Sequence, residues 1–575
     1  MLTLTKHFRT DYRIVIAESP SPSIFHAAEE LRHFLGEITG VGFPIVFDDA
    51  EPIDTEIIIG QNRHFEALQT GIDICELGFE GVWIQTVGTS LILAGSDVRG
   101  ALYAVYEFLD CYLGCRWFTA ELSKIPHRPD LTIPEINHRY IPQLELRDPY
   151  NCGYSDPDFM CRNRVNSGFH GKLSRAQGGC VFYARFVHTM NELVPPEQYY
   201  DTHPEYFALQ YDKNGENPTR RGGYSQPCLT NPDVLQIALK NVRKILDENP
   251  DASIMSVSQN DIHFSCQCEN CRAVDREEGS PSGALLRFVN AIAEDIEKDY
   301  PNVAIDTLAY VYTRKPPRIT KPRKNVIVRL CSIECCFGHP LESCSYTWMD
   351  GGGHSTFSAD LEGWASISNR LHIWDYTANF AHALQPFPDF KVLKPNIQYF
   401  IRNGVTGIFE EGENCIPERG ELYALRQYVL ARLLWNPEQD VDQMINEFLF
   451  AYYGMAAPAV RAWFDLLHDQ VKEDTHVCIY DSPHQPYLSP AFLDESDLLF
   501  DQAERMADSE VFLQRVKTLR FSIRYVRLCN TPNTDPGRKE AAEEFIRDVR
   551  EAGIGSYREG TKLEDIEPKI LEGSI

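Results

Sequence analysis

The sequence predicts an α/β protein: a (β/α)8 TIM-like barrel, preceded by a small α/β domain and followed by a helical C-terminal region. Three observations predict it. Strand-like apolar runs alternate with helical segments through the middle of the chain, four of those runs end in acidic, amide or aromatic side chains, and helical patterns fill the remainder. We place the three parts at residues 1–135, 140–440 and 441–575.

The first part of the chain alternates strand and helix patterns. Residues 12–16, 56–60 and 90–95 are apolar runs typical of buried strands, while residues 23–38 and 100–113 carry apolar side chains at helical spacing. This alternation predicts a small α/β domain. A connector with prolines at positions 126, 129, 134 and 142 then separates it from the barrel.

The middle of the chain supplies the strands expected for a barrel. Helical segments at residues 232–246 and 282–297 separate several of these strands, which favours parallel pairing. A long segment, residues 189–231, is expected to form a loop over the barrel mouth. Strand-like runs lie near residues 144, 181, 254, 305, 326, 371 and 405, with a weaker eighth at 161–165.

The C-terminal part is predicted to be helical. Apolar side chains recur there at helical spacing in five consecutive segments. We expect these helices to cover the outside of the barrel and to extend beyond it. The segments are residues 422–434, 441–452, 457–471, 489–506 and 509–528.

Composition narrows the class of partner. The 575 residues are 43% hydrophobic and carry a net charge of −28, which disfavours nucleic acid and anionic membranes. No apolar run reaches the roughly 18 to 20 residues of a membrane helix, and the first residues lack the pattern of a signal peptide. We therefore expect a cytoplasmic protein with a neutral or weakly charged substrate; the sequence predicts no oligomeric state.

The chain contains 17 cysteines, without the regular spacing of a disulfide scaffold. Cys266, Cys268 and Cys271 are clustered, and a zinc site there would need His263 or a distant cysteine as fourth ligand. The alternative is a tight loop of buried thiols. We assign no metal ligand and no cofactor from the sequence.

Acidic residues at strand ends suggest catalysis at the barrel mouth, because the carboxyl ends of parallel barrel strands meet there. Two carboxylates at one mouth suit hydrolysis of a glycosidic bond. We predict Asp261, Glu410 and Glu334 as catalytic, and Glu410 rather than Glu411 as facing the mouth, since successive strand residues point in opposite directions. The alternative for Glu334 is a structural ion pair with Arg329 or His339.

Other polar and aromatic residues near the same strand ends are predicted to bind the sugar. Aromatic rings can stack on a pyranose face, and amides, carboxylates, histidine and arginine can bind hydroxyl or acidic groups. Three of them also have a structural alternative: a turn for Asn260, core packing for Trp374 and a satisfied structural group for His188. The predicted set is Asn260, Trp374, Asp375, Tyr376, Asn379, Tyr310, His188 and Arg147.

Several phrases of the sequence resemble known families. Gly95–Leu109 with Leu113–Phe118 resembles the N-terminal domain of α-glucuronidases. The phrases His203–Phe207, Gln226–Pro232, Ser258–Asp261 and Leu434–Pro437 resemble a bacterial domain of unknown function, number 4838, which is associated with glycoside hydrolase family 163. That resemblance implies an endo-β-N-acetylglucosaminidase-like barrel enzyme.

The residues and the resemblance together predict a glycoside hydrolase acting on a β-linked amino sugar or a related oligosaccharide. Catalysis would use carboxylates as acid and base, with or without assistance from the substrate's own acetamido group. The alternatives are an α-glucuronidase-like hydrolase of uronic-acid glycosides and a carbohydrate-binding barrel without activity. A metal-dependent hydrolase is disfavoured, since no H-E-x-x-H spacing occurs.

Overall fold

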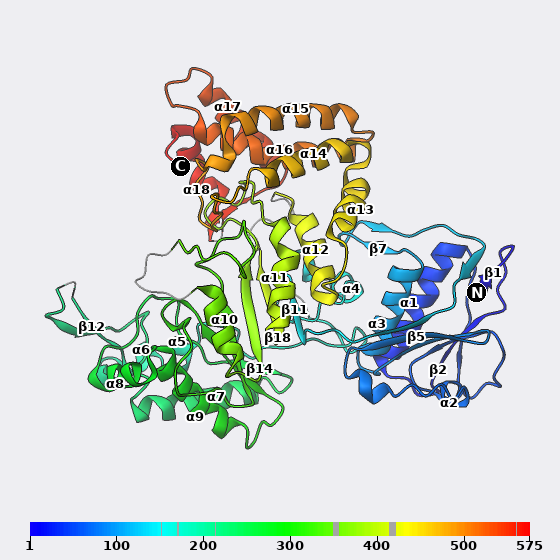
Figure 1. The fold of residues 1–575 in the computed structure, drawn as a ribbon, viewed down its shortest axis with the longest axis horizontal. Helices are drawn as coiled ribbons and strands as arrows, with labels where there is room; N and C mark the ends of the chain where they lie inside the picture. Colours follow the sequence, from blue (N-terminus) through cyan, green and yellow to red (C-terminus); the bar gives the residue numbers. More distant parts are fainter. Residues whose placement is uncertain (151, 170–171, 213, 349–355, 413–420, 559) are drawn as a thin grey trace.

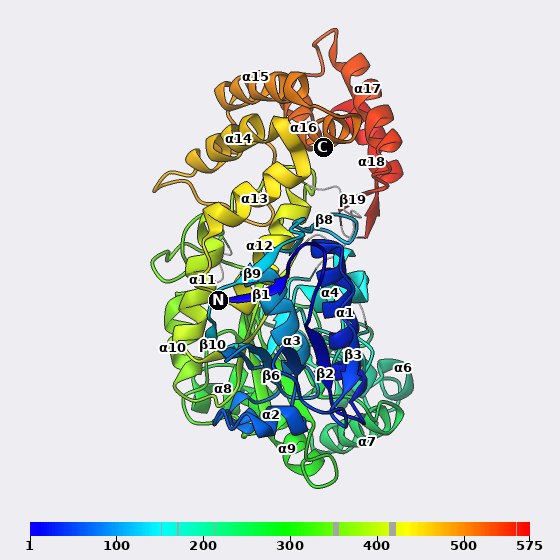
Figure 2. The same cartoon turned by 90° about the vertical axis from the view of Figure 1, so that its right-hand side faces the viewer.

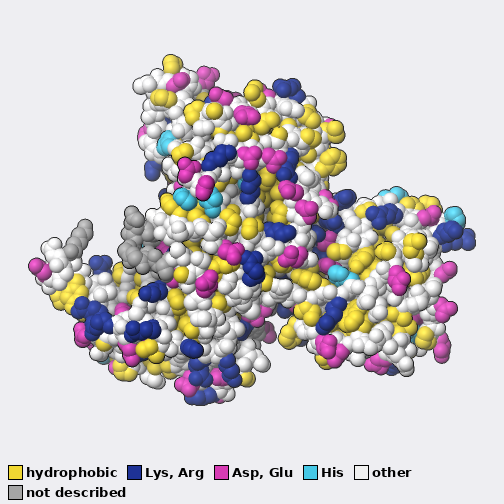
Figure 3. Space-filling model, in the orientation of Figure 1, with side chains coloured by type: hydrophobic (Ala, Val, Ile, Leu, Met, Phe, Trp, Pro, Cys, Tyr) yellow, Lys and Arg dark blue, Asp and Glu magenta, His cyan; other side chains and the backbone are white. Residues whose placement is uncertain are grey.

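The fold, known from a computed structural model, is described for residues 1–575 except 151, 170–171, 213, 349–355, 413–420 and 559. An N-terminal sheet with its helices lies beside a central parallel sheet, and a helical C-terminal region lies above both (Figures 1 and 2). On the face shown in Figure 3, basic and acidic side chains are interspersed. None of the described helices is both long and apolar enough to cross a membrane.

The N-terminal part is a six-stranded mixed sheet in the order β10-β5-β6-β4-β2-β3. Alternation along its strands separates two apolar faces: Ile57 and Ile59 of β4 pack with α1 and α3, while Ile58 packs with Phe65 of α2 on the opposite side. The elements are β1 Leu2–Thr5, β2 Arg13–Ile16, α1 Pro22–Thr39, β3 Ile45–Phe47, β4 Glu56–Ile59, α2 Arg63–Ala67, β5 Val82–Val87, β6 Ser90–Gly95, α3 Gly100–Glu107, β7 Arg116–Trp117, β8 Ser123–Lys124, β9 Leu131–Ile133 and β10 Asn137–Tyr140.

The central part is a curled six-stranded sheet in the order β11-β18-β17-β16-β15-β14, with every neighbouring pair parallel. Parallel strands expose the same end of each strand at one edge, so their carboxyl ends gather together. The elements are β11 Leu146–Asp148, α4 Pro157–Arg162, α5 Met190–Leu193, α6 Pro196–Tyr199, β12 Leu209–Tyr211, β13 Pro218–Arg220, α7 Pro232–Glu248, β14 Ile254–Ser256, α8 Glu269–Glu278, α9 Ser282–Ile296, β15 Ala304–Ala309, β16 Val326–Cys331, α10 Phe357–Ala365, β17 Leu371–Tyr376, α11 Phe390–Arg402, β18 Val405–Glu411 and α12 Tyr423–Trp435.

The eight-stranded barrel is predicted correctly only in part. The prediction of a weak strand at residues 161–165 is wrong, because the helix α4 occupies the start of that segment. The strand expected near Val181 is replaced by isolated parallel bridges, from Val181 to Ser167 and from Tyr183 to Ile254. Six strands therefore form a continuous ladder in the described chain, and two short bridged segments follow beyond β14.

A side chain bridges the segment of these isolated pairs to β11. The Asn166 amide accepts a hydrogen bond from the Arg147 backbone N–H (2.9 Å) and donates one to the Glu145 carbonyl (2.9 Å), as a neighbouring strand would do. Asn166 is completely buried and also donates to Glu80 of the N-terminal part. One amide thus replaces two backbone bonds of a strand that does not form.

The C-terminal helices agree closely with the predicted segments. The α12 helix packs on α13 through Tyr428 and Phe448, whose ring centroids lie 5.7 Å apart, and the apolar core runs continuously from the sheet into this region. The elements are α13 Val441–Tyr453, α14 Ala457–Asp469, α15 Pro490–Met506, α16 Glu510–Asn530, α17 Arg538–Glu551, β19 Ser556–Arg558, β20 Thr561–Lys562 and α18 Leu563–Glu572.

Buried ion pairs join the N-terminal part to the central part. Asp110 accepts from three guanidinium groups, those of Arg116 (2.7 Å), Arg164 (3.1 Å) and Arg432 (2.9 Å). Burial alone would raise the pKa of Asp110, but these three cations outweigh it and hold the pKa at about 2. Because Arg432 belongs to α12, the network fixes this helix against the helical segment that follows α3 in the N-terminal part.

Candidate active site

A cavity of about 290 Å³ opens at the carboxyl ends of β15, β16, β17 and β18. Most of its walls are aromatic or aliphatic, and its polar groups include two carboxylates, Asp261 and Glu411, and one imidazole, His188. An apolar cavity with a few convergent polar groups is the usual form of a small-molecule site. The lining residues are Tyr150, Phe169, Phe186, Val187, His188, Asp261, Leu308, Tyr310, Cys331, Ile333, Trp374, Tyr376, Phe380, Phe409, Glu411, Ile479 and Tyr480.

Asp261 and Tyr310 form a hydrogen-bonded pair in this cavity. The Tyr310 hydroxyl donates to the Asp261 carboxylate (2.9 Å), and the Asp261 backbone N–H donates to the Tyr224 hydroxyl (3.0 Å). Burial, followed by the Asp261 charge, raises the pKa of Tyr310, which therefore stays a donor at neutral pH. Val311 follows with a positive φ of 50°, a strained conformation for a β-branched residue. The structure thus places the predicted Asp261 and Tyr310 together at the cavity.

Glu411, and not Glu410, faces the cavity, so the prediction that Glu410 faces the mouth is wrong. Glu411 accepts a hydrogen bond from the Trp374 indole (2.8 Å) and lines the cavity with that ring. Glu410 lies on the opposite face of β18, against Tyr423 and Arg426 of α12. The strand alternation predicted that only one of the two would face the mouth, but it did not fix which one.

The side of the sheet that carries Glu410 holds a buried acidic cluster. Glu410 pairs in register with Asp375, and Asp389 lies close enough to influence both. Burial raises the pKa of Glu410 well above its ordinary value, with a further contribution from the charges of Asp375 and Asp389. Burial likewise raises the pKa of Asp375 to about 6. Asp375 accepts from the Ser332 hydroxyl and the Tyr376 backbone N–H and does not line the cavity.

Aromatic rings form the floor of the cavity. Trp374 and Tyr376, both predicted, face it together with Phe409 and Phe186; the Trp374 and Phe409 centroids lie 4.7 Å apart. Beneath them the buried Arg329 guanidinium lies 4.7 Å from the Phe186 ring centroid and 5.8 Å from that of Trp374. The rings offer apolar faces of the kind that stack on sugar rings.

His188 is held at the cavity in a strained conformation. Its φ is 55°, its backbone N–H donates to the Ser258 hydroxyl (2.9 Å), and its Nδ1 lies 2.8 Å from the Gln259 carbonyl oxygen. A carbonyl can only accept, so Nδ1 carries a proton and Nε2 is the nitrogen able to gain or lose one. Positive φ at a non-glycine residue marks a position that its surroundings over-determine.

Glu334 and Asn260 are held by contacts with other residues of the protein. Glu334 is buried in an ion pair with Arg314, which also binds Asp360 at 2.8 Å, so its partner is neither of the two considered from the sequence. The Asn260 side chain bonds to Asn191 and to the Ser225 carbonyl. Both residues lie beside the strand ends as expected, but neither lines the cavity.

Asn379 and Arg147 likewise contact other parts of the chain and do not line the cavity. The Asn379 amide donates to the Asp481 carbonyl (2.8 Å) and thereby anchors the C-terminal segment that brings Ile479 and Tyr480 to the cavity. Arg147 is buried in an ion pair with Glu80 (2.6 Å) at the junction with the N-terminal sheet. No local pattern in the sequence indicated that Tyr480 would reach this cavity.

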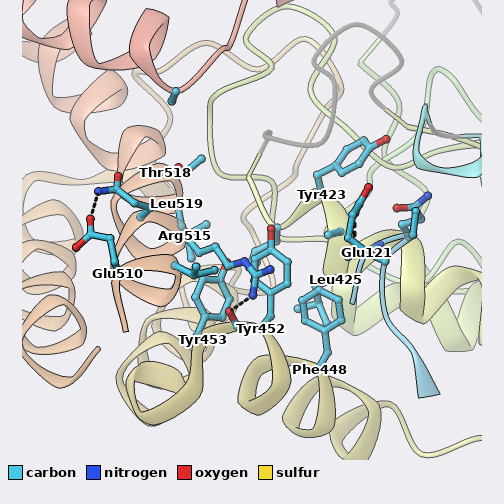
Figure 4. Close-up of a pocket in the computed structure, with 18 of the residues that line it drawn as sticks. Glu121, Tyr423, Leu425, Phe448, Tyr452, Tyr453, Glu510, Arg515, Thr518 and Leu519 are labelled. Carbon is cyan, nitrogen blue, oxygen red and sulfur yellow. Dashed lines mark hydrogen bonds between the residues drawn. The ribbon is translucent and has the colours of Figure 1, made fainter. Parts of the chain in front are cut away.

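A larger cavity, of about 560 Å³, lies among α12, α13, α16 and the loop at residues 119–121 (Figure 4). Tyr423 and Glu121 are near each other on one side of it, and Arg515 contacts Tyr452 on the other, 4.0 Å from its ring centroid and bonded to its carbonyl. This cavity lies away from the ends of β15 and β16. The smaller cavity is the better candidate because it opens at the carboxyl ends of the parallel strands, where the active sites of such folds lie.

Residues 117–465, more than half of the chain, match the family described as "Domain of unknown function (DUF4838)", and the chain belongs to that family. Residues 3–108 match "Glycosyl hydrolase family 67 N-terminus". Both resemblances expected from the sequence are therefore found. A specific link to glycoside hydrolase family 163 is not among these findings.

The chain is also similar to curated proteins over part of its length. The chain is 26% identical over 154 residues to the probable alpha-glucuronidase A of Neosartorya fischeri, covering 26% of this chain and 17% of that protein. With the corresponding protein of Aspergillus fumigatus the identity is 24% over 176 residues, 30% and 19% of the two chains. The alignments thus span about a fifth of these relatives' length.

One solved structure resembles the entire fold. It is a family GH115 4-O-methyl-alpha-glucuronidase with specificity for decorated arabinogalactans, with 12% identity and a TM-score of 0.57 over 100% of this chain and 79% of that one. At this identity the similarity concerns the fold alone. It agrees with a glycoside hydrolase-like arrangement of a curled parallel sheet and a helical C-terminal region.

Proposed function

We propose that the protein is a glycoside hydrolase whose active site is the cavity lined by Asp261 and Glu411. The observation that carries the proposal is the convergence of these two carboxylates on one aromatic cavity at the carboxyl ends of the parallel strands. The N-terminal match to glycosyl hydrolase family 67 supports the same class of reaction. Two carboxylates satisfy the need for a proton donor and for a group that attacks or activates water.

The surroundings of the two carboxylates suggest their roles. Asp261 is exposed and accepts from Tyr310, a contact that stabilises a carboxylate; we assign it the role of base or nucleophile. Glu411 is half-buried among aromatic rings, and apolar surroundings favour the neutral form of a carboxylic acid. We assign it the role of proton donor to the leaving oxygen.

The proposed substrate is a uronic-acid glycoside. The relatives described above are named alpha-glucuronidases, and the fold resembles another enzyme of that name. His188 is the one lining side chain, among the described residues, that can become a cation and bind a sugar carboxylate. None of these relatives supports the endo-β-N-acetylglucosaminidase activity that the sequence resemblance implies, so we place that activity second.

Release of sugar from defined glycosides tests the proposal. Purified protein is incubated with oligosaccharides bearing terminal glucuronic or 4-O-methylglucuronic acid, with aryl β-N-acetylglucosaminide and with N-glycans. We expect release of the uronic acid, and a loss of about 10²- to 10⁴-fold in kcat for Asp261→Asn. Absence of hydrolysis in every arm, or an Asp261→Asn variant as active as the wild type, would contradict the proposal.

A further inference from the structure

Four cysteines from two distant segments meet in the folded chain. Cys228 precedes α7, while Cys266, Cys268 and Cys271 lie at the start of α8, and the four sulfur atoms are all within 4.8 Å of one another. The Cys228 sulfur lies 3.6 Å from that of Cys268 and 3.8 Å from that of Cys271. The distant cysteine that the sequence left open as a fourth partner is thus Cys228, and not His263.

These distances fit a tetrahedral metal site. With zinc–sulfur bonds of about 2.3 Å, tetrahedral geometry places neighbouring sulfur atoms about 3.8 Å apart. A disulfide would need about 2.05 Å, and all four cysteines are free thiols. Four thiols at this spacing form a closed cage, which is the arrangement of structural zinc and leaves no open position for a substrate.

The groups around the cage are suited to thiolates. The Leu209 backbone N–H donates to the Cys266 sulfur (3.3 Å), the Arg220 guanidinium lies 4.0 Å from the same atom, and the Thr230 hydroxyl lies 3.2 Å from the Cys271 sulfur. Such outer contacts orient metal ligands and favour their charged form. The hairpin β12–β13 supplies the first two of these contacts.

We propose that Cys228, Cys266, Cys268 and Cys271 bind a structural zinc ion that fastens the segment before α7, where Cys228 lies, to the segment that runs from Asp261 into α8. This differs from the sequence analysis, which assigned no metal. Binding ties together residues that are about 40 positions apart, and the fastened segment runs directly from the cavity carboxylate to α8. The ion therefore holds the loop of the active-site aspartate in place.

A second cluster carries the same inference independently. Cys336, His339, Cys344 and His476 place one ligand atom each within 4.8 Å of the others. The Cys336 sulfur lies 3.4 Å from His339 Nδ1, and the Cys344 sulfur lies 3.8 Å from His476 Nδ1. His339 Nε2 lies 3.0 Å from the Lys472 carbonyl, so Nε2 carries the proton and Nδ1 is the ligand nitrogen. We infer a second, Cys2His2 zinc site here.

This second site joins the loop after β16 to the C-terminal segment that reaches the cavity. His476 stacks on Tyr346, with 4.0 Å between centroids, and lies four residues before Tyr480 of the cavity wall. In the described chain, the two clusters are the groups of histidine, cysteine and acidic residues found with metal-ligand spacing. Each would fix one wall of the proposed active site.

The metal content of the 575-residue chain tests both sites without reference to activity. Protein purified with zinc present and dialysed without chelator should contain about two zinc ions per chain by elemental mass spectrometry, and Cys271→Ser or His476→Ala should each lower the content by about one. Cys75→Ser and His203→Ala change an exposed thiol and an exposed imidazole outside the clusters and should keep both ions.

Cobalt substitution gives an assay that does not depend on the folding of a variant. Wild-type protein loaded with Co²⁺ should show the absorption bands of tetrahedral thiolate ligation, and zinc should abolish them. If the wild-type protein contains no zinc as purified and shows none of these bands after loading with Co²⁺, both proposals are overturned. Two zinc ions retained in Cys271→Ser would overturn the first site, and two retained in His476→Ala the second.

Discussion

At the scale of single residues, position along a strand was easier to predict than side-chain direction. The sequence placed Asp261, Tyr310 and Trp374 at strand ends, and the structure brings all three to one cavity. It preferred Glu410 over Glu411, and the fold reverses that choice. An apolar run that is buried on both faces carries no alternation, so nothing in residues 405–411 indicated which face meets the cavity.

Asp375 is expected to make the folded protein less stable at neutral pH than at acidic pH, because its folded pKa of about 6 is above that of an unfolded aspartate. Its stabilising effect is complete below about pH 4 and is lost as the pH rises through 6. The unfolding free energy of Asp375→Asn relative to the wild type should therefore rise by about 2 to 3 kcal/mol from pH 4 to pH 8, by denaturant unfolding. Asp251→Asn, at an exposed position, should show no such trend.

His188 is expected to determine the preference for an acidic sugar. Replacement by glutamine keeps a hydrogen-bonding group but removes a side chain that can carry a positive charge, so KM for a glucuronide should rise by about tenfold or more while KM for the matching neutral glucoside stays within a few-fold. Steady-state kinetics on the two substrates measures this difference. An equal rise for both would show that His188 only supports the loop.

At the scale of elements, helices were predicted well and the ends of the barrel ladder were not. The five C-terminal helical segments were recognisable because apolar residues repeat along one face. The sequence did not reveal that the expected eighth strand fails to form, because its place is taken by the Asn166 side chain and by isolated bridges. Such a substitution depends on contacts between segments and leaves no local pattern.

Asn166→Ala should therefore destabilise the protein. It removes the partners of a buried backbone N–H and a part-buried carbonyl, and a buried polar group left unsatisfied costs about 1 to 3 kcal/mol. We expect a loss of about 2 to 4 kcal/mol in the unfolding free energy, measured by denaturant titration. Asn403→Ala, which removes one half-buried bond at the end of α11, should cost less than half as much.

At the scale of the whole molecule, charges hold the N-terminal and central parts together. Asp110 binds arginines from β7, from the segment after α4 and from α12. The composition showed an excess of acidic residues. It did not show that a few of them would be buried among arginines where two parts of the chain meet. Packing between distant segments determines which charges meet, and local sequence patterns carry no information about that packing.

Asp110→Asn should weaken this junction. Removing one member of a buried ionic network leaves uncompensated charge, at a cost of about 3 to 5 kcal/mol. The wild-type carboxylate, with a pKa of about 2, stabilises above about pH 4 and loses this effect as the pH falls toward 2. The difference between the two proteins in denaturant unfolding should shrink over that range. As a control, Glu76→Gln removes the exposed ion pair with Arg139 and should lower the unfolding free energy by about 1 kcal/mol or less.

The turnover of Glu411→Gln beside that of Glu410→Gln tests the central claim most directly. The two variants differ by one position on one strand, and each preserves the side-chain shape. With the glycoside that the wild-type protein hydrolyses, Glu411→Gln should lose about 10²- to 10⁴-fold in kcat, while Glu410→Gln should stay within a few-fold of the wild type. The reverse result, with Glu410→Gln inactive and Glu411→Gln active, would contradict the account.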